Sequence, residues 1–169
     1  MSGLTSDVVL SVRWIDTDLP RPHWRSTANV RLHPRLQAGL EWNPDAHEVA
    51  PLATLFLLTE HERQPSVFLG TSSDRIGSPA GKQAYFVTVA KTVPAWRVAP
   101  YVTFHYSEWS ERVLVPFGAH VDLTHGFSAQ PMYDGHRTHL LGTWANERVS
   151  ATVIWAWLER AGVAFSVGF

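Results

Sequence analysis

The feature that most constrains the fold of this chain is a period of two in its hydrophobicity, which repeats along nearly its whole length. Segments of about 7 to 11 residues alternate apolar side chains with polar or small ones, and clusters of Pro, Gly, Asp and Asn separate them. In "SDVVLSVRWID", for example, one face would carry Leu10, Val12 and Trp14, and the other Ser11 and Arg13. Successive side chains of a β-strand point to opposite faces, so this alternation predicts an all-β fold.

About twelve such segments follow one another, although ten strands would also be consistent with the pattern. We expect strands at residues 6–16, 23–33, 36–42, 52–60, 66–72, 84–91, 98–107, 113–123, 127–133, 139–145, 149–159 and 162–169. Longer, more polar connections alternate with tighter ones along the chain. A meander with short turns at one end and longer loops at the other has the connectivity of an up-and-down antiparallel barrel. Closure of such a barrel would pair the last segment with the first.

The composition sets limits on the class of protein. A chain of 169 residues is long enough for one domain, and we expect residues 1–169 to form a single barrel. The formal net charge of −1 offers no basic surface, so a nucleic acid is excluded as a partner. Cysteine is absent, which excludes disulfides and thiolate chemistry.

The solvent around the barrel does not follow from alternation alone, because a soluble β-sandwich has the same pattern. The aromatic residues favour a membrane, since Trp and Tyr rings are enriched at membrane–water interfaces and here they lie near strand ends. The Trp residues that we expect at a lipid interface are Trp14, Trp24, Trp42, Trp96, Trp144, Trp155 and Trp157. Lysine, which commonly protects the edges of soluble sheets, is nearly absent from the predicted strands, with Lys91 as the exception.

The opposite face of the strands carries charged and polar side chains, which suit a hydrated or ion-paired lumen. The residues that we expect to face this lumen are Arg13, Arg25, Arg31, Glu41, His105, His120, Asp122 and His139. The three arginines would either form an anion-selective constriction, or pair with Glu41 and Asp122 and plug the lumen.

The last segment, "AGVAFSVGF", resembles the terminal strand of bacterial outer-membrane β-barrel proteins, whose last residue is typically Phe and whose preceding alternate positions are apolar or aromatic. Val163, Phe165, Val167 and Phe169 match this pattern position by position. The resemblance implies a transmembrane barrel in the outer membrane of a Gram-negative-type bacterium, with an even number of strands and both chain ends in the periplasm. It also implies that the barrel-assembly machinery recognises the terminal strand. One departure from the family is the N-terminal "MSGLTSDVV", in which we expect no signal peptide.

The expected function is that of a porin-like, narrow passive channel, or of a structural barrel without catalysis, in contact with the lipid bilayer. No cofactor, metal site or catalytic residue is expected. The Gly-rich stretch "GTSSDRIGSPAGK" lacks the strand and helix context of a phosphate loop. We interpret it as a loop, either on the surface or folded into the barrel.

Two other functions remain open at this point. One is a lipid-modifying enzyme of the outer membrane, for which His105, His120 and Asp122 are the best candidate centre. His120 and Asp122 are two residues apart, so they point to the same face of one strand. The other is a soluble β-barrel that binds an apolar ligand in its interior, which would invert the facing of the apolar and polar residues.

Overall fold

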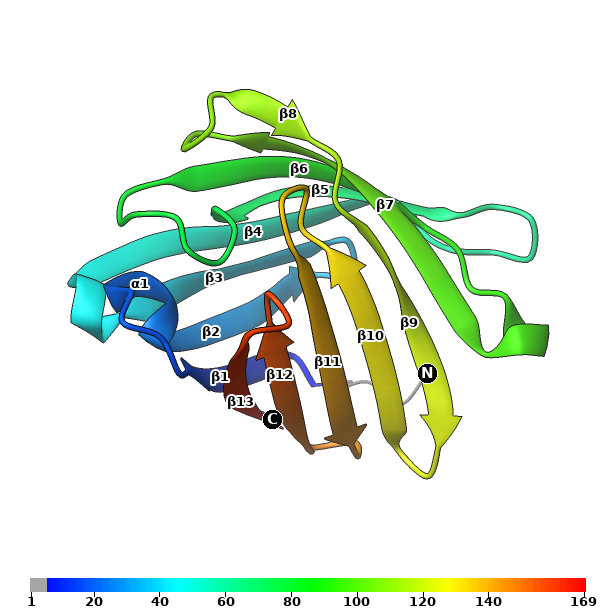
Figure 1. Cartoon of the computed structure of the whole chain (residues 1–169). Helices are drawn as coiled ribbons and strands as arrows, with labels where there is room; N and C mark the ends of the chain where they lie inside the picture. The colour runs from blue at the N-terminus through cyan, green and yellow to red at the C-terminus, as the bar shows by residue number, and fades with distance from the viewer. Residues whose placement is uncertain (1–5) are drawn as a thin grey trace.

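The strands close into an up-and-down antiparallel barrel, as the alternation predicts (Figure 1). The structure is a computed structural model that describes residues 6–169. Among these residues, thirteen strands form one sheet, which closes through pairing of β6 with β7. The short β8 and β9 lie one after the other against β7, so the closed wall contains 12 strands.

The strands are β1 (Val8–Ile15), β2 (Trp24–His33), β3 (Leu36–Asn43), β4 (Glu48–Leu58), β5 (Ser66–Ser73), β6 (Gln83–Ala90), β7 (Val98–Ser107), β8 (Arg112–Leu114), β9 (Phe117–Thr124), β10 (Phe127–Tyr133), β11 (Thr138–Ala145), β12 (Val149–Ala156) and β13 (Arg160–Gly168). Within residues 6–169, the helical segments are α1 (Pro20–His23), η1 (Pro44–Ala46) and η2 (Pro94–Trp96). No helix in this part of the chain is long and apolar enough to cross a membrane.

At two of the places where strands differ from the expected segments, a proline is involved. The segment expected at 113–123 is divided into β8 and β9, because Pro116 has no N–H to give to the sheet. The carbonyl of Pro116 still accepts a hydrogen bond of 2.8 Å from the Thr103 N–H. The segment expected to begin at residue 52 begins at Glu48, so β4 includes Pro51, which lies opposite Leu40.

The two ends of the barrel have different connections. One end, which we call the loop end, carries residues 16–23, 44–47, 74–82, 108–111, 134–137 and 157–159. The other, the turn end, carries residues 34–35, 59–65, 91–97, 125–126 and 146–148, together with the start of β1 and the end of β13. In Figure 1, α1 lies at the loop end and the label C marks the turn end.

The first and last strands form the seam that closes the barrel. β1 and β13 are antiparallel, with Leu10 opposite Val167 and Val12 opposite Phe165. Where the seam ends, the Phe169 N–H donates to the Val8 carbonyl at 2.9 Å. The Phe169 carbonyl accepts from the N–H groups of Asp7 and Val8. The two strands thus cover each other's edges, which would otherwise be open to pairing with another chain.

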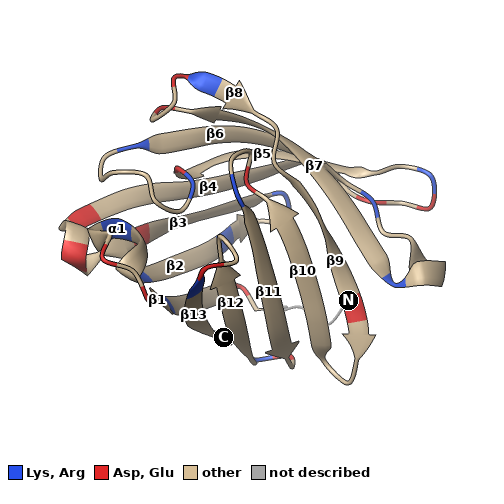
Figure 2. Cartoon of the chain, viewed as in Figure 1, with Lys and Arg blue, Asp and Glu red and all other residues tan. Residues whose placement is uncertain are grey.

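The register places apolar side chains outside and most charged ones inside or at the ends. Leu40 and Val153, at outward positions of β3 and β12, are 58% and 65% exposed. Ile15, Ile154 and Ala156 form a small buried cluster near the loop end, where β1 and β12 end. Figure 2 shows most acidic and basic residues in loops and near strand ends.

Candidate functional site

The interior of the barrel contains a cavity of about 650 Å³ with two different walls. The polar wall, on β1, β2 and β13, is lined by Ser11, Arg13, Thr27, Asn29 and Ser166. The more apolar wall, on β4, β6, β7, β10 and the β8–β9 connection, is lined by Leu52, Phe86, Tyr101, Met132 and Pro116. It also carries Thr88 and Thr103, whose hydroxyls are hydrogen-bonded to each other at 2.8 Å. β1 and β7 lie across the barrel from each other in the closed wall, so Arg13 and Tyr101 line the cavity from opposite sides.

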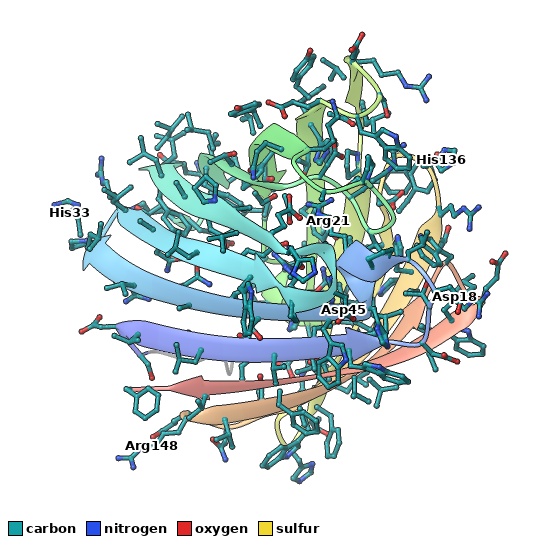
Figure 3. All side chains as sticks on the ribbon, turned by 90° about the vertical axis from the view of Figure 1, so that its left-hand side faces the viewer. Asp18, Arg21, His33, Asp45, His136 and Arg148 are labelled. Atoms are coloured by element: carbon teal, nitrogen blue, oxygen red, sulfur yellow. The ribbon has the colours of Figure 1, made fainter. Side chains whose placement is uncertain are left out.

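Two ion pairs occupy the loop-end part of the interior. Arg21, on α1, lies inside the outline of the barrel in Figure 3, and its Nε is 3.0 Å from Glu48 Oε2. Arg25, on β2, lies 2.5 Å from Glu41 Oε2. Asn43 joins the two pairs, because its Nδ2 donates to Glu41 at 2.8 Å and to Glu48 at 3.3 Å. Added hydrogen bonds of this kind offset the desolvation of buried charges.

The local sequence explains how Arg21 reaches the interior. Arg21 stands between Pro20 and Pro22, and proline is favoured in the first turn of a helix because its φ is already helical. Arg21 also donates to the carbonyls of Asp74 and Ser78 at 3.5 Å and to that of Lys82 at 3.4 Å. Arg21 therefore connects α1 to loop 74–82 through hydrogen bonds. No periodic pattern in the sequence indicates this position, because Arg21 lies in a connection.

Loop 74–82 folds into the barrel, the second of the two positions expected for it, and Asp74 holds it there. The Asp74 carboxylate accepts hydrogen bonds from Ser107 Oγ at 2.6 Å, from the Arg75 N–H at 2.7 Å and from the Trp109 N–H at 3.2 Å. Its Oδ1 also lies 3.3 Å from His105 Nε2. Burial alone would raise the pKa of Asp74, but the hydrogen bonds, first that of His105, outweigh burial and hold the pKa well below its usual range. Asp74 is therefore an anion at neutral pH.

Asp74, Ser107 and His105 are the residue types of a hydrolase triad, but their arrangement is different. In a triad, the hydroxyl donates to the histidine, and the carboxylate orients that histidine. Here Ser107 and His105 both bond to Asp74 directly. Ser107 is also completely buried. The cluster therefore fixes a loop and does not activate a hydroxyl nucleophile.

Another buried carboxylate, that of Asp134, joins two further connections at the loop end. Asp134 accepts hydrogen bonds from the N–H groups of His136 and Arg137, and its Oδ2 lies 2.9 Å from His139 Nε2. The Trp157 N–H donates to His139 Nδ1 at 3.2 Å. Because Nδ1 accepts, the ring proton is on Nε2 and is donated to Asp134. His139, which is 1% exposed, thus links residues 134–137 to residues 157–159.

Arg13 has no acidic partner, unlike Arg21 and Arg25. Among residues 6–169, no carboxylate oxygen lies within 4.0 Å of the Arg13 guanidinium, and its Nε is buried without a hydrogen-bond partner. Its cross-strand neighbour Arg25 pairs with Glu41 instead. Arg13 therefore presents a positive charge to the cavity that no protein carboxylate neutralises by direct contact.

Four of the other residues expected in the lumen line the cavity, and Arg31 does not. His105 and His139 line the cavity, together with Arg25 and Glu41. Arg31 is exposed and lines a separate small pocket at the turn end with Asp7 and His33.

The expected centre of His105, His120 and Asp122 does not form. β7 and β9 are neighbours, but His120 lies opposite Ala99, six residues from His105 along β7. At about 3.3 Å per residue, His105 and His120 are separated by about 20 Å. Asp122 lies farther still toward the turn end, where its N–H donates to the Arg97 carbonyl, and it pairs with none of the lumen arginines. Within residues 6–169, no three His, Asp or Glu side chains come together as metal ligands.

Most of the Trp residues expected at a lipid interface lie at the outer surface near the ends of the barrel. Those that are more than a third exposed are Trp24, Trp42, Trp96, Trp144 and Trp155. Trp14 is half-buried, and its indole donates to His23 Nε2 at 2.9 Å. Trp157 differs from the expectation, because β12 ends at Ala156 and the φ of Trp157 is 56°. This turn directs Trp157 onto the inner cluster of Ile15, Ile154 and Ala156.

Together, the closed wall, the inward loop and the two-sided cavity define a β-barrel with a partly filled lumen. No protein-family model matches the chain, and no curated protein matches it.

Proposed function

We propose that the protein is an integral β-barrel of a bacterial outer membrane, with a narrow passive pathway through its lumen. The observation that carries this proposal is the chemistry of the outer face. In residues 6–169, the outward strand positions set by the register hold no Asp, Glu, Lys or Arg, and their only His is His33, at the last residue of β2. Soluble proteins rarely expose continuous apolar surface of this extent, whereas the outer face of a membrane barrel is a continuous apolar band.

The aromatic residues support the same proposal. Trp24 and Trp42 lie near the loop end, and Trp96 and Trp144 lie near the turn end, all exposed. Indole rings at both edges of an apolar band suit the two interfaces of a bilayer. The alternation of Val163, Phe165 and Val167 on β13, with Phe165 57% exposed, supports recognition of this strand by the barrel-assembly machinery.

The interior supports a passive role. The cavity has a partly polar wall, which suits a hydrated pathway. Ser107 is not available as a nucleophile, because its hydroxyl donates a hydrogen bond to the Asp74 carboxylate. Loop 74–82 and Arg21 occupy the lumen near the loop end, so we expect the pathway to be closed there in the resting state. A barrel that only stabilises the membrane is the alternative outcome.

Refolding of the purified chain tests both parts of the proposal. In detergent, we expect heat-modifiable gel migration and a β-type circular dichroism spectrum, and in buffer alone we expect aggregation. A monodisperse protein in buffer without detergent would overturn the membrane location. The other informative result is a barrel that inserts into planar bilayers and gives no conductance steps, even in a variant that lacks the contacts of Arg21 with loop 74–82. That result would overturn the pathway but not the membrane location.

A further inference from the structure

We propose that the cavity binds an organic anion with an apolar body, and that Arg13 is the residue that binds its carboxylate. This inference goes beyond the pathway proposed above and requires only the folded barrel. Its starting point is the unpaired guanidinium of Arg13, whose buried Nε has no partner among residues 6–169. Arg13 lines the cavity and has no carboxylate within 4.0 Å among the described residues, so its guanidinium is the group to which an anionic ligand in the cavity would bond.

The two carboxylates of the neighbouring ion pairs are not free to take this place. Glu41 is bound by Arg25, by Ser73 Oγ at 2.5 Å and by Asn43. Glu48 is bound by Arg21 and accepts from the Gly81 N–H at 2.6 Å. Moving either carboxylate to Arg13 would break these contacts, so neither of them is free to bond to the Arg13 guanidinium directly.

The surroundings of Arg13 suit a carboxylate group. The planar guanidinium can give two parallel N–H donors to one carboxylate. Ser11, Thr27 and Ser166 bring hydroxyl groups to the same wall, and in the register Ser11 lies opposite both Thr27 and Ser166. Hydroxyls can donate to the remaining lone pairs of an anion.

The opposite wall indicates what the rest of the ligand is like. Leu52, Phe86, Tyr101 and Met132 line it and offer apolar or aromatic surface. A volume of about 650 Å³ is within the range of about 300–1,000 Å³ that is typical of pockets for small organic molecules. A small inorganic anion would use only the polar wall, whereas an aryl or alkyl carboxylate would use both.

Isothermal titration calorimetry on the detergent-refolded barrel tests this proposal, with 4-phenylbutyrate as the probe and 4-phenylbutanamide as its uncharged equivalent. We expect the carboxylate to bind at least about tenfold more tightly than the amide, because only the carboxylate neutralises Arg13. Arg13→Gln should remove this difference. Arg31→Gln, which changes an exposed arginine on β2 outside the cavity, should leave it unchanged.

Several results would overturn the proposal. Equal affinity of the wild-type barrel for the carboxylate and the amide would exclude a role for Arg13, even if Arg13→Gln failed to fold. An unchanged affinity in a folded Arg13→Gln variant would do the same. If inorganic phosphate competed as well as 4-phenylbutyrate, the more apolar wall would contribute nothing and the proposed ligand class would be wrong. Tyr101→Ala should weaken 4-phenylbutyrate and leave phosphate unaffected.

Discussion

Arg21 Nε and Glu48 Oε2 meet at 3.0 Å inside the loop end of the barrel, where both side chains are only 7% exposed. The pair joins α1 to the first residue of β4, and through Arg21 it also reaches the backbone of loop 74–82. A contact that connects three segments of one end is expected to control both stability and access to the lumen.

Removal of Arg21 should therefore be strongly destabilising. Arg21→Ala leaves the Glu48 carboxylate buried without its counter-charge, and losses of about 3–5 kcal/mol are typical of such changes. The free energy of unfolding, measured by Trp fluorescence in guanidinium chloride, checks this value. The matched control is Arg137→Ala, because Arg137 and Glu159 form a pair of 3.7 Å with side chains that are 50% and 68% exposed. An exposed pair contributes about 0–1 kcal/mol, so similar losses in the two variants would contradict the prediction.

Asp74 should determine whether loop 74–82 stays inside the barrel. Asp74→Asn replaces an anion that accepts from Ser107, Arg75 and Trp109 by a neutral amide. We expect the loop to leave the lumen part of the time, which trypsin detects as faster cleavage after Arg75 or Lys82 in the folded barrel. Asp18→Asn, in an exposed connection at the same end, should leave the cleavage rate unchanged. Equal acceleration by both variants would show that the loop is held by other contacts.

The same carboxylate predicts how the loop responds to pH. The pKa of Asp74 is lowered in the folded barrel relative to its ordinary value of 3.8. Its stabilising contribution is therefore complete above about pH 4, and it is lost as the pH falls further toward the lowered pKa of the folded state. Trypsin cannot be used at such pH, so cleavage by pepsin between pH 4 and 2 is the measurement. Release of the loop between pH 7 and 5 would contradict the assignment.

The sequence predicts the strands well because each of them has an apolar outer face and a more polar inner face. In β1, Leu10 and Val12 face outward while Ser11 and Arg13 face inward, and this contrast is visible without a structure. Alternation also predicts the closing pair of β1 and β13 from strand order. It fails at Pro116, where a missing N–H divides a continuous pattern into β8 and β9.

The site is predicted less well, because it depends on register and on connections. His105 and His120 lie on neighbouring strands, yet a relative shift of six residues along β7 places them far apart. Arg21 and Asp74 lie in connections, where no period indicates the direction of a side chain. For Arg25, the sequence is consistent with either an anion-selective constriction or a pair with an acidic residue. Only the distance between the β2 and β3 side chains shows the pair with Glu41.

The outer face predicts a dependence on depth in the membrane. Val153 and Val149 are on the outward side of β12, Val153 in the middle of the strand and Val149 at its turn-end start. An arginine at the midplane of a bilayer costs about 2–4 kcal/mol, and near the interface about 0–1 kcal/mol. Val153→Arg should therefore reduce folding into phospholipid vesicles much more than Val149→Arg, as measured by heat-modifiable migration. Equal yields of the two variants would contradict an outer face in lipid.

Phe169 allows the side chain and the backbone of the terminal strand to be tested separately. Its backbone N–H donates to Val8 and its carbonyl accepts from Asp7 and Val8, while its ring is exposed, so the ring contributes little to the seam. Phe169→Ala should refold in detergent like the wild type. When exported in a Gram-negative host, the variant should assemble poorly, because the barrel-assembly machinery of the host would recognise the ring. Deletion of Phe169 should impair both processes, since the backbone hydrogen bonds are lost as well. If Phe169→Ala reduced refolding and assembly equally, the ring would only pack against the barrel, and recognition of the terminal strand would lose its support.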